Sequence, residues 1–488
     1  MTSPATRVKM NVSISEIYNF LGDTWLSKFA ESLNIPILNN KLICKYPRNP
    51  TKKTHSKPKT FLVLNICLNT VLSLPIGLVY LMYQQLLMIR VSKIKAINER
   101  DIFVSSIIYQ NEYHENTTSE NFFWGPLKNL SIELNRSTCY VLVPYKKIRI
   151  EETKTSQKYK TVDLRSCRSS FFLTRYFITL LASNVFYISV VFKLFFKSRT
   201  TKEIKKLILE EHQLILGREL SSTIFIKMLM TDFSKLILKN RVFFTCEGQD
   251  WEISMLKEIS AHNNLHAVVH VPLRAGDSQI NVYELIDEFS KPLNLTFLTP
   301  GENSRKLLSA VIKGKYPIRD VEAQRFIKGG QIQKSLPLNK RGQSISLFLS
   351  ADYNYDLDLL NMLVESFSEI PGDHIYVYPH PSDRKILDKK TIPKFMTVSE
   401  KYIPTHINLF SLSTSTFLNK IFFGSVIAIY QQVSGFSPLG DLNHDLFFND
   451  KETLIELIKR NYIFQQNDIV SVINTNENLK LWQNFLSE

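Results

Sequence analysis

Residues 344–381 read SISLFLSADYNYDLDLLNMLVESFSEIPGDHIYVYPHP. Two short runs in it, 344–350 and 374–381, are rich in β-branched and aromatic residues and are typical of buried strands. Between them, from Asp356 to Ile370, apolar residues recur at the spacing of one helix face, which predicts a helix. A strand, a helix and a second strand in this order indicate neighbouring parallel strands of an α/β sheet. The pattern continues with predicted strands at 407–413 and 426–430, a helix start at 415–423 and a helix at 451–460.

The same alternation occurs earlier in the chain. Strands are predicted at 101–109, 139–145, 241–249, 266–272 and 293–300, and helical segments at 171–238, 251–262 and 302–312. A linker is predicted at 329–343, where apolar content is low. We therefore predict an α/β protein with two Rossmann-like, doubly wound domains that face a cleft. The predicted boundaries are 1–100 for a basic, membrane-associated helical appendage, 101–335 for a first domain with a helical insertion, and 340–488 for a second domain.

Composition narrows the class of protein. With 488 residues, 44% of them hydrophobic and 22% charged, the chain is too long for one ordinary domain and too apolar for general disorder. The net charge is +15, and residues 41–100 alone carry +10, from eleven basic residues and one acidic residue. Because the rest is only mildly basic, nucleic-acid binding is a poor interpretation. Five scattered cysteines without a CxxC motif argue against a disulfide framework or a zinc site and favour the cytoplasm.

An uncharged run of thirty residues, Thr60 to Ile89, is long enough to span a bilayer. Basic residues flank it on both sides, so the positive-inside rule gives no orientation. A helix lying on anionic lipid fits two basic flanks at least as well as a spanning helix. The alternative is a pair of buried core helices. A second uncharged stretch, Tyr176 to Phe192, is marginal for a span and is interpreted as a buried helix.

Two polar motifs follow strands of the second domain. His380 comes just after the strand 374–381, between Pro379 and Pro381, which limit the backbone around it. An imidazole there can donate to a phosphate or ribose oxygen, although an isolated turn histidine is the commoner case. The second motif places hydroxyl groups where a strand ends and a helix begins, a position suited to phosphate but also to ordinary capping. Its residues are Ser413, Thr414, Ser415 and Thr416. Together the two motifs predict a nucleotide site.

A third motif, TCEGQDWE (245–252), follows a strand of the first domain. A carboxylate at a strand end can act as general base toward an acceptor hydroxyl, and we rank Glu247 first and Asp250 second. The alternative for Asp250 and Glu252 is complementing a helix dipole. The Trp251 ring could stack on a sugar, and His270, at the next strand end, could line the acceptor site.

Several common motifs are missing from the sequence. No GxxxxGK, GxGxxG or HExxH pattern and no metal-ligand spacing occurs. The pair Asp356 and Asp358 is interpreted as a solvated first helical turn. Metal-free catalysis without a cofactor is the resulting expectation.

At this point the sequence resembles known families. The stretches YPHPSDR (378–384) and SLSTSTF (411–417) resemble the histidine-proline and Ser/Thr motifs of bacterial sialyltransferase-like glycosyltransferases. The stretches FFWGPL (122–127), CEGQDWE (246–252) and 301–326 resemble bacterial surface-carbohydrate biosynthesis proteins.

The resemblance covers roughly residues 101–445 and implies a two-domain GT-B fold and a CMP-activated acidic sugar as donor. His380 and Pro381 would meet the CMP, with Arg384 in the same stretch, and Ser413 to Thr416 its phosphate. In the sialyltransferases two adjacent acids precede a glycine, whereas only Glu247 precedes Gly248 here.

The predicted function is a metal-independent glycosyltransferase at the cytoplasmic face of the membrane, held there through residues 41–100. It would move a CMP-activated sialic or other nonulosonic-type sugar onto a glycan or lipid-linked acceptor in capsule or O-antigen biosynthesis. One alternative is a CDP-glycerol-type glycerophosphotransferase, which also combines a histidine-proline motif with a hydroxyl-rich turn. Another is a non-catalytic, membrane-bound assembly factor for polysaccharide.

Overall fold

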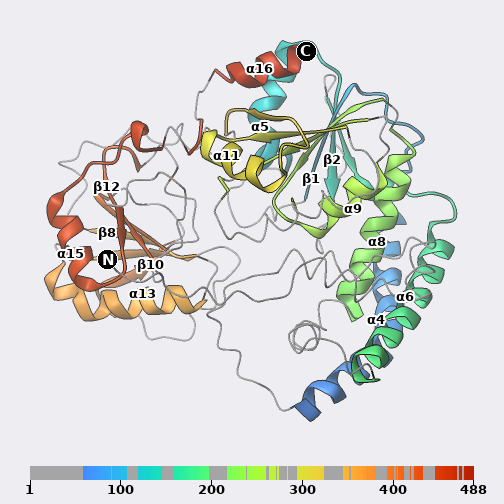
Figure 1. Ribbon diagram of the computed structural model, residues 1–488, viewed down its shortest axis with the longest axis horizontal. Coiled ribbons are helices and arrows are strands. Elements are labelled where there is room, and N and C mark those ends of the chain that lie inside the picture. The colour runs from blue at the N-terminus through green and yellow to red at the C-terminus, as the bar shows by residue number, and fades with distance from the viewer. Residues whose placement is uncertain are drawn as a thin grey trace.

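The protein consists of two α/β lobes, which stand side by side in Figure 1. The computed structural model describes residues 59–89, 91–106, 119–144, 159–196, 217–237, 239–259, 263–270, 272–273, 283, 294–323, 344–350, 353–370, 372–379, 393–399, 403, 405–411, 418, 422–431, 446–469, 472–474 and 478–488. Each lobe is built on one parallel sheet. This confirms the predicted fold class, a two-domain GT-B arrangement with an apolar helix at the start of the described chain.

The N-terminal lobe contains a seven-stranded sheet in the order β3-β2-β1-β4-β5-β6-β7. The strands are β1 (Asp101–Ser106), β2 (Thr138–Val143), β3 (Tyr159–Asp163), β4 (Arg241–Thr245), β5 (Asn264–Val268), β6 (Leu295–Thr299) and β7 (Ile318–Asp320). All neighbouring pairs are parallel. The chain winds from β1 outward to β3 and then returns to add β4 on the other side of β1. The winding direction therefore reverses between β1 and β4, the place where such sheets bind ligands.

The C-terminal lobe repeats this plan with six parallel strands in the order β10-β9-β8-β11-β12-β13. The strands are β8 (Ile345–Phe348), β9 (Ile375–Tyr378), β10 (Met396–Val398), β11 (Ile407–Ser411), β12 (Val426–Tyr430) and β13 (Phe447–Phe448). Here the winding direction reverses between β8 and β11. The short outer strands β3, β7, β10 and β13 were not predicted, because they carry too few consecutive apolar residues to produce a strand pattern.

Helices cover both faces of the N-terminal sheet, and each of the two sheets has an apolar core on both sides. In β1, Ile102 and Val104 face a core shared with α8 (Gly217–Ser234), α9 (Asp250–Glu258) and α11 (Glu302–Val311), while Phe103 faces α5 (Ser119–Glu133). In the C-terminal lobe, α13 (Tyr353–Ser366) and α15 (Lys451–Arg460) share a core with Leu347 on one face of the sheet. Short 3₁₀ turns lie at Leu164–Cys167, Phe367–Glu369 and Gln466–Ile469.

Two long apolar helices form an outer layer on the N-terminal lobe. Helix α4 (Lys59–Ile89) runs on through Pro75, and α6 (Phe172–Phe196) lies beside it; both pack on α8, which is buried beneath them. The sequence predicted a buried helix for Tyr176 to Phe192, and this is wrong on its outer side. Phe177, Ile178, Leu181 and Val185 are 44–51% exposed there.

The last helix, α16 (Lys480–Ser487), returns from the C-terminal lobe to the N-terminal lobe (Figure 1). Glu322 is buried and accepts hydrogen bonds from the N–H groups of Leu481 (2.8 Å) and Trp482 (3.0 Å). The Trp482 ring packs in the core that contains Phe103. A carboxylate at a helix N-terminus satisfies free N–H groups and complements the helix dipole. The N-terminal lobe therefore includes residues from both ends of the described chain, beyond the predicted range 101–335.

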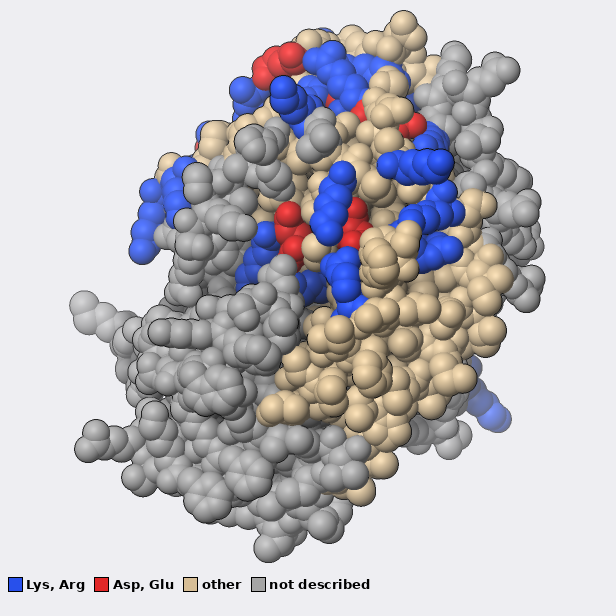
Figure 2. All heavy atoms as spheres, turned by 90° about the vertical axis from the view of Figure 1, so that its right-hand side faces the viewer, with Lys and Arg blue, Asp and Glu red and all other residues tan. Residues whose placement is uncertain are grey.

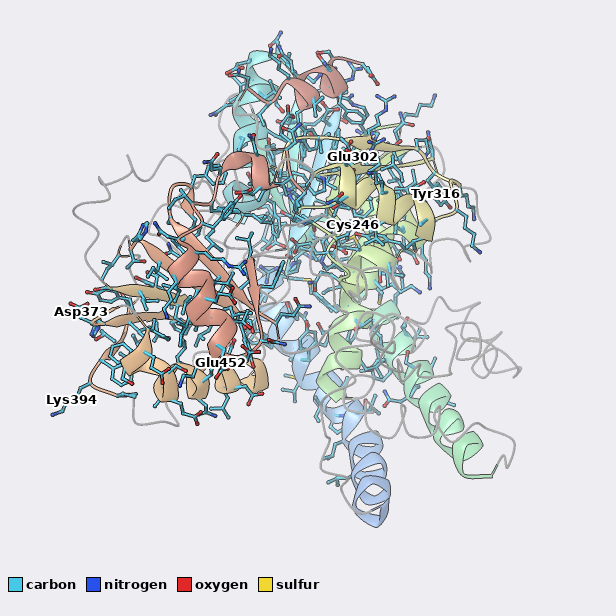
Figure 3. All side chains as sticks on the ribbon, turned by 60° about the vertical axis from the view of Figure 1, so that its left-hand side comes forward. Cys246, Glu302, Tyr316, Asp373, Lys394 and Glu452 are labelled. Carbon is cyan, nitrogen blue, oxygen red and sulfur yellow. The ribbon has the colours of Figure 1, made fainter. Side chains whose placement is uncertain are left out.

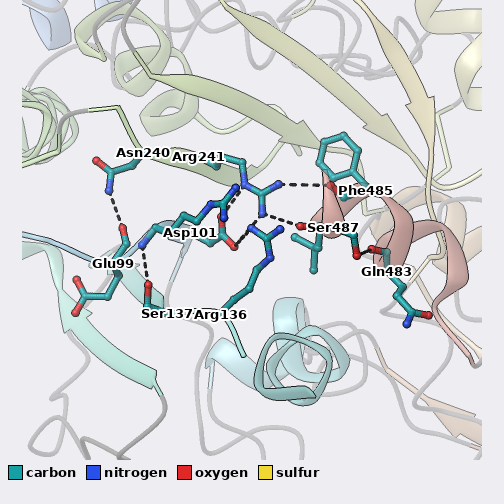
Figure 4. A network of polar contacts seen from close by, with 11 residues as sticks. Glu99, Asp101, Arg136, Ser137, Asn240, Arg241, Gln483, Phe485 and Ser487 are labelled. Atoms are coloured by element: carbon teal, nitrogen blue, oxygen red, sulfur yellow. Dashed lines mark hydrogen bonds and ion pairs between the residues drawn. The ribbon is translucent and has the colours of Figure 1, made fainter. Parts of the chain in front are cut away.

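The C-terminal end of α16 is fixed by an arginine. Arg241 donates to the carbonyl groups of Phe485 (3.4 Å) and Leu486 (3.3 Å), and it also donates to Asp101, at 2.7 Å and 3.0 Å (Figure 4). Arg136 also donates to the fully buried Asp101. Two guanidinium groups on one buried carboxylate make an arrangement in which loss of one partner leaves an uncompensated charge.

His266 lies in β5, beneath this helix. Its ring stacks on Phe243 (centroids 4.7 Å apart) and meets the Phe485 ring edge-on (5.0 Å). Neither ring nitrogen has a hydrogen-bond partner among the described residues. Burial, and next the charges of Arg241 and Arg319, lower the pKa of His266 to about 3.

This pKa predicts a loss of stability on mild acidification. Because the unfolded histidine titrates near pH 6.5, the proton is taken up by the unfolded state as the pH falls below that value. The contribution of His266 to the free energy of unfolding is therefore present above pH 6.5 and is lost as the pH falls. The free energy of unfolding should decline by about 2 kcal/mol between pH 7 and pH 5. In His266→Phe, which keeps a ring but cannot titrate, the decline should be smaller by this amount. Urea unfolding at the two pH values measures the difference. His374→Phe, at a half-exposed site, is the control, and equal declines in wild type and His266→Phe would contradict the prediction.

Candidate functional site

The carboxyl ends of both sheets lie on the sides of the lobes that face one another. At the end of β6, the Pro300 carbonyl accepts from the N–H of Asn474 (2.6 Å), which belongs to the chain leaving the C-terminal lobe. In the other lobe, Asp373 and Lys394 precede β9 and β10, and Figure 3 shows both on the side away from the N-terminal lobe. The strands therefore run toward the N-terminal lobe. Gly301 follows Pro300 where a Cβ atom would lie 2.6 Å from the Val472 carbonyl oxygen, so the chains meet without room for a side chain.

The loop after β4 is organised around one buried carboxylate. Glu252, in the first turn of α9, is fully buried and accepts the backbone N–H groups of Glu247 (3.0 Å), Gly248 (2.9 Å) and Gln249 (2.9 Å). The Thr245 hydroxyl donates to the same group (3.2 Å). Gly248 allows this tight turn because its φ is +80°, a region that other residues rarely adopt. Burial raises the pKa of Glu252, while the backbone donors act in the opposite direction.

This arrangement separates the acids of the TCEGQDWE motif. Glu252 is part of the framework, since its oxygens are occupied by the loop backbone. Glu247 is half-buried two residues beyond β4, the strand beside the reversal point, and directly follows Cys246, which is labelled in Figure 3. Asp250 is the first residue of α9. Of the two acids predicted as base, Glu247 therefore lies nearer the strand end.

Trp251 does not occupy the predicted acceptor position. Only 1% of it is exposed, and it packs among the core residues under the sheet. The prediction that its ring stacks on a sugar is therefore wrong for this conformation, because no face of the ring is available. Trp251 is buried because it lies on the side of α9 that faces the sheet.

His270, two residues beyond β5, is also buried rather than open to solvent. Its ring contacts Phe123 (centroids 5.2 Å apart) and Trp124 (4.9 Å), both from α5. These aromatic residues come from the FFWGPL stretch, which forms part of α5 and not a separate patch. His270 follows β5 and the Glu247 loop follows β4, its neighbour in the sheet. The imidazole therefore packs below the carboxyl end of the sheet and does not line its surface.

The C-terminal lobe uses the same device at its own reversal point. Asp356, in the first turn of α13, is buried and accepts from both the N–H and the hydroxyl of Ser350 (2.9 Å each), two residues after β8. The prediction that Asp356 belongs to a solvated turn is therefore wrong. The sequence signal that was missed is an acid seven or eight residues after a strand, in the first turn of the next helix, as in Glu252 and Asp356.

Three aromatic rings fix the spacing of the strands that lead to the two predicted nucleotide motifs. Tyr378 at the end of β9 stacks on Phe348 of β8 (4.7 Å), and Phe348 stacks on Phe410 of β11 (4.8 Å). β9 and β11 therefore flank β8, with ends at one edge, about 10 Å apart across two strand spacings. The predicted motif residues that follow these strands lie outside the described part of the chain: His380, Pro381, Arg384, Ser413, Thr414, Ser415 and Thr416.

Among the residues that the structure describes, no group of three or more His, Cys, Asp or Glu side chains could hold a metal ion. Beside the reversal points, the described polar residues include Glu247 in one lobe and the Ser350–Asp356 pair in the other.

No protein-family model matches the chain, and no curated protein matches it. Solved structures with a similar arrangement include trehalose-6-phosphate synthase from Burkholderia multivorans, with 10% identity, a TM-score of 0.43 and coverage of 80% of this chain and 97% of that one. UDP-N-acetylglucosamine 2-epimerase from Rickettsia bellii has 12% identity and a TM-score of 0.43, covering 80% and 95%. The glycosyltransferase SnogD from Streptomyces nogalater has 11% identity and a TM-score of 0.37, covering 80% and 100%. The resemblance to sialyltransferase-like enzymes remains a prediction from the motifs.

The contacts of Glu252 predict a graded loss of stability. Glu252→Ala removes the acceptor for three backbone N–H groups, and each unmet buried donor costs about 1–3 kcal/mol. Glu252→Gln should lose less, because its one oxygen can still accept from Gly248 and Gln249. Denaturant unfolding followed by circular dichroism measures both variants.

Glu302→Ala, in the exposed first turn of α11, provides the control and should change the free energy of unfolding little. If the Glu252→Ala protein unfolds at the same denaturant concentration as this control, the carboxylate does not hold the loop.

Proposed function

We propose that the protein is a GT-B glycosyltransferase that moves a sugar from a nucleotide-activated donor to a surface-glycan acceptor. The favoured donor is a CMP-activated sialic or other nonulosonic-type acid, and the pathway is capsule or O-antigen biosynthesis. The donor preference rests on the motifs at 378–384 and 411–417. The acceptor would be a glycan or a lipid-linked saccharide.

One observation carries the proposal. β9 and β11, which lead into the histidine-proline and hydroxyl-rich motifs, flank β8 at the reversal point of the C-terminal sheet. Ligands of open α/β sheets bind at such points, outside the carboxyl ends of the strands. Of the two motifs suited to phosphate and ribose, one follows β11, which borders the expected ligand position, and the other follows β9, one strand away on the far side of β8.

In the proposed reaction, the acceptor hydroxyl loses its proton to the Glu247 carboxylate, with Asp250 as the second candidate. The freed electron pair of the hydroxyl oxygen forms a bond to the anomeric carbon of the donor. The bond from that carbon to the phosphate oxygen breaks, and its electrons leave with the nucleotide. Donors from His380 and the residues 413–416 would stabilise the negative charge that develops on the phosphate.

The donor site predicts selective nucleotide binding. In a thermal-shift screen against CMP, CDP, UDP and GDP, we expect CMP to raise the melting temperature most. The double variant His380→Ala, Ser415→Ala should lose this shift and release CMP from an activated donor at least tenfold more slowly. Removal of donors to a developing phosphate charge commonly has such effects. The matched control is His374→Ala, Ser368→Ala, which changes the same residue types outside the motifs of the same lobe.

The outcomes of this screen separate the alternatives. Preference for CDP, with release from CDP-glycerol, would replace the proposal by a glycerophosphotransferase. Absence of a shift with every nucleotide would favour the non-catalytic assembly factor. If the double variant releases CMP as fast as wild type, the proposed nucleotide site is wrong. The protein could then still be a glycosyltransferase that uses Glu247.

Glu247 has its own test. Glu247→Gln keeps the shape of the side chain but cannot accept a proton, so kcat should fall by about 10²–10⁴-fold. Nucleotide binding and the melting temperature should remain as in wild type, because the loop is held by Glu252. Glu133→Gln, an exposed site at the far end of α5, is the control. If Glu247→Gln keeps full activity, Glu247 is not the base, and Asp250 becomes the candidate. The variant Asp250→Asn then tests that residue.

A further inference from the structure

The outer surface of α4 and α6 consists of exposed apolar side chains. On α4 they recur every three or four residues, which places them on one face of the helix. They are Leu68, Leu72, Ile76, Val79, Met82, Leu86 and Ile89, with exposed fractions of 37–73%. On α6 and just before it, the exposed apolar residues are Phe171, Leu173, Phe177, Ile178, Leu181 and Val185, at 36–74%. We call these thirteen residues the α4–α6 apolar surface.

The opposite face of α4 packs on the N-terminal lobe and mixes apolar residues, such as Met88, with small and polar ones. Ser73 and Gln84 are buried, and Gly77 lies so close to Leu180 and Ser221 that a Cβ atom would be 2.6 Å and 2.7 Å from them. A surface helix of a soluble protein normally presents a polar face to solvent, whereas the outward face of α4 is apolar. Only 22% of the apolar window Leu72–Ile89 is buried, so α4 is not a core helix. Contiguous apolar surfaces of this kind mark an interaction site.

Basic side chains border this surface at one end. There the chain after α4, the start of α6 and the end of α8 are joined, because Arg175 pairs with Asp232 (2.6 Å) and Lys93 donates to Ser170 (2.9 Å). Lys95 is exposed, as is Lys235, beside Asp232. Figure 2 shows Lys and Arg side chains gathered along the border of a broad surface without charges, with some acidic groups among them. This combination is complementary to a bilayer with anionic headgroups.

The packing of α4 determines how it can meet a bilayer. One side of α4 packs on α8, which is itself buried and carries the ion pair of Lys227 with Glu258 (3.9 Å). A helix that crosses a bilayer alone is surrounded by lipid, whereas α4 is packed on the lobe along one side from Leu74 to Met88. By length and composition α4 is the one helix in the described part of the chain that could span a membrane. Its attachment along α8 instead suits a helix lying in the interface, apolar side down.

We propose that the α4–α6 apolar surface lies in the interface of an anionic lipid bilayer, in the plane of the membrane, with Lys93, Lys95 and Lys235 at the headgroups. The sequence predicted membrane association for residues 41–100 alone, as a spanning or an interfacial segment. The structure adds α6 as a second half of the contact and favours the interfacial mode. This inference does not depend on the proposed reaction.

Flotation of the full chain with vesicles tests the proposal. Vesicles of three parts phosphatidylcholine and one part phosphatidylglycerol should bind the protein, and pure phosphatidylcholine should bind it more weakly. The triple variant Val79→Gln, Met82→Gln, Leu86→Gln and the α6 variant Phe177→Gln, Leu181→Gln should each reduce binding at least tenfold. The matched control is Val364→Gln, Val398→Gln, Ile403→Gln, which removes exposed apolar residues of the C-terminal lobe and should bind as wild type.

Further measurements keep the result decisive. Circular dichroism and melting temperature confirm that the variants are folded, as expected for exposed positions. Environment-sensitive labels on the single variants Leu72→Cys, Val79→Cys and Leu86→Cys should all report the same shallow depth against spin-labelled lipids. A deep position for Val79→Cys alone would show a spanning helix and overturn the in-plane mode. A variant that changes from dimer to monomer, with no vesicle binding by the wild type, would identify a second copy as the occupant. Undiminished binding by both apolar variants would also overturn the proposal.

Discussion

A carboxylate buried at the beginning of a helix determines the form of each lobe at its reversal point. Glu252 gathers three backbone N–H groups of the loop after β4, and Asp356 holds Ser350 after β8. Burying such a group is costly unless its oxygens are hydrogen-bonded, and here the loop backbone supplies the donors. The turn and the buried acid therefore require one another. The consequence is a fixed backbone at the one position in each sheet where a ligand is expected.

This constraint also explains how neighbouring acids acquire different roles. Glu247 and Glu252 are five residues apart, yet one is fully buried and bonded while the other is half-buried at the edge. A proposed general base needs a fixed position and access to the proton that it accepts. Glu252 fixes the position of the Glu247 backbone by accepting its N–H group. Because Glu252 is fully buried, it has no access to an acceptor hydroxyl itself.

Much of the fold could be predicted because buried parallel strands are short, continuous apolar runs. The prediction for Val426–Tyr430 and for the helix Lys451–Arg460 agrees with the structure to the residue. The edge strand Ile318–Asp320 has no such run, and it forms because β6 offers its backbone groups. Trp251 was placed wrongly because sequence spacing gives the angle between residues of a helix but not which side meets the sheet. Asp356 was placed wrongly for a related reason, since only the packed turn makes burial of a carboxylate favourable.

The outer helices and the candidate base are connected through two packed helices. α4 and α6 cover α8, and α8 is bonded to α9, because the Thr231 hydroxyl donates to Glu258 (2.9 Å). α9 begins at Asp250, immediately after the loop that carries Glu247. An enzyme whose acceptor is attached to lipid must hold its base at a constant height above the bilayer. In the proposed enzyme, the continuous stack of apolar outer layer, buried helix α8 and the loop that carries Glu247 would set that height by packing.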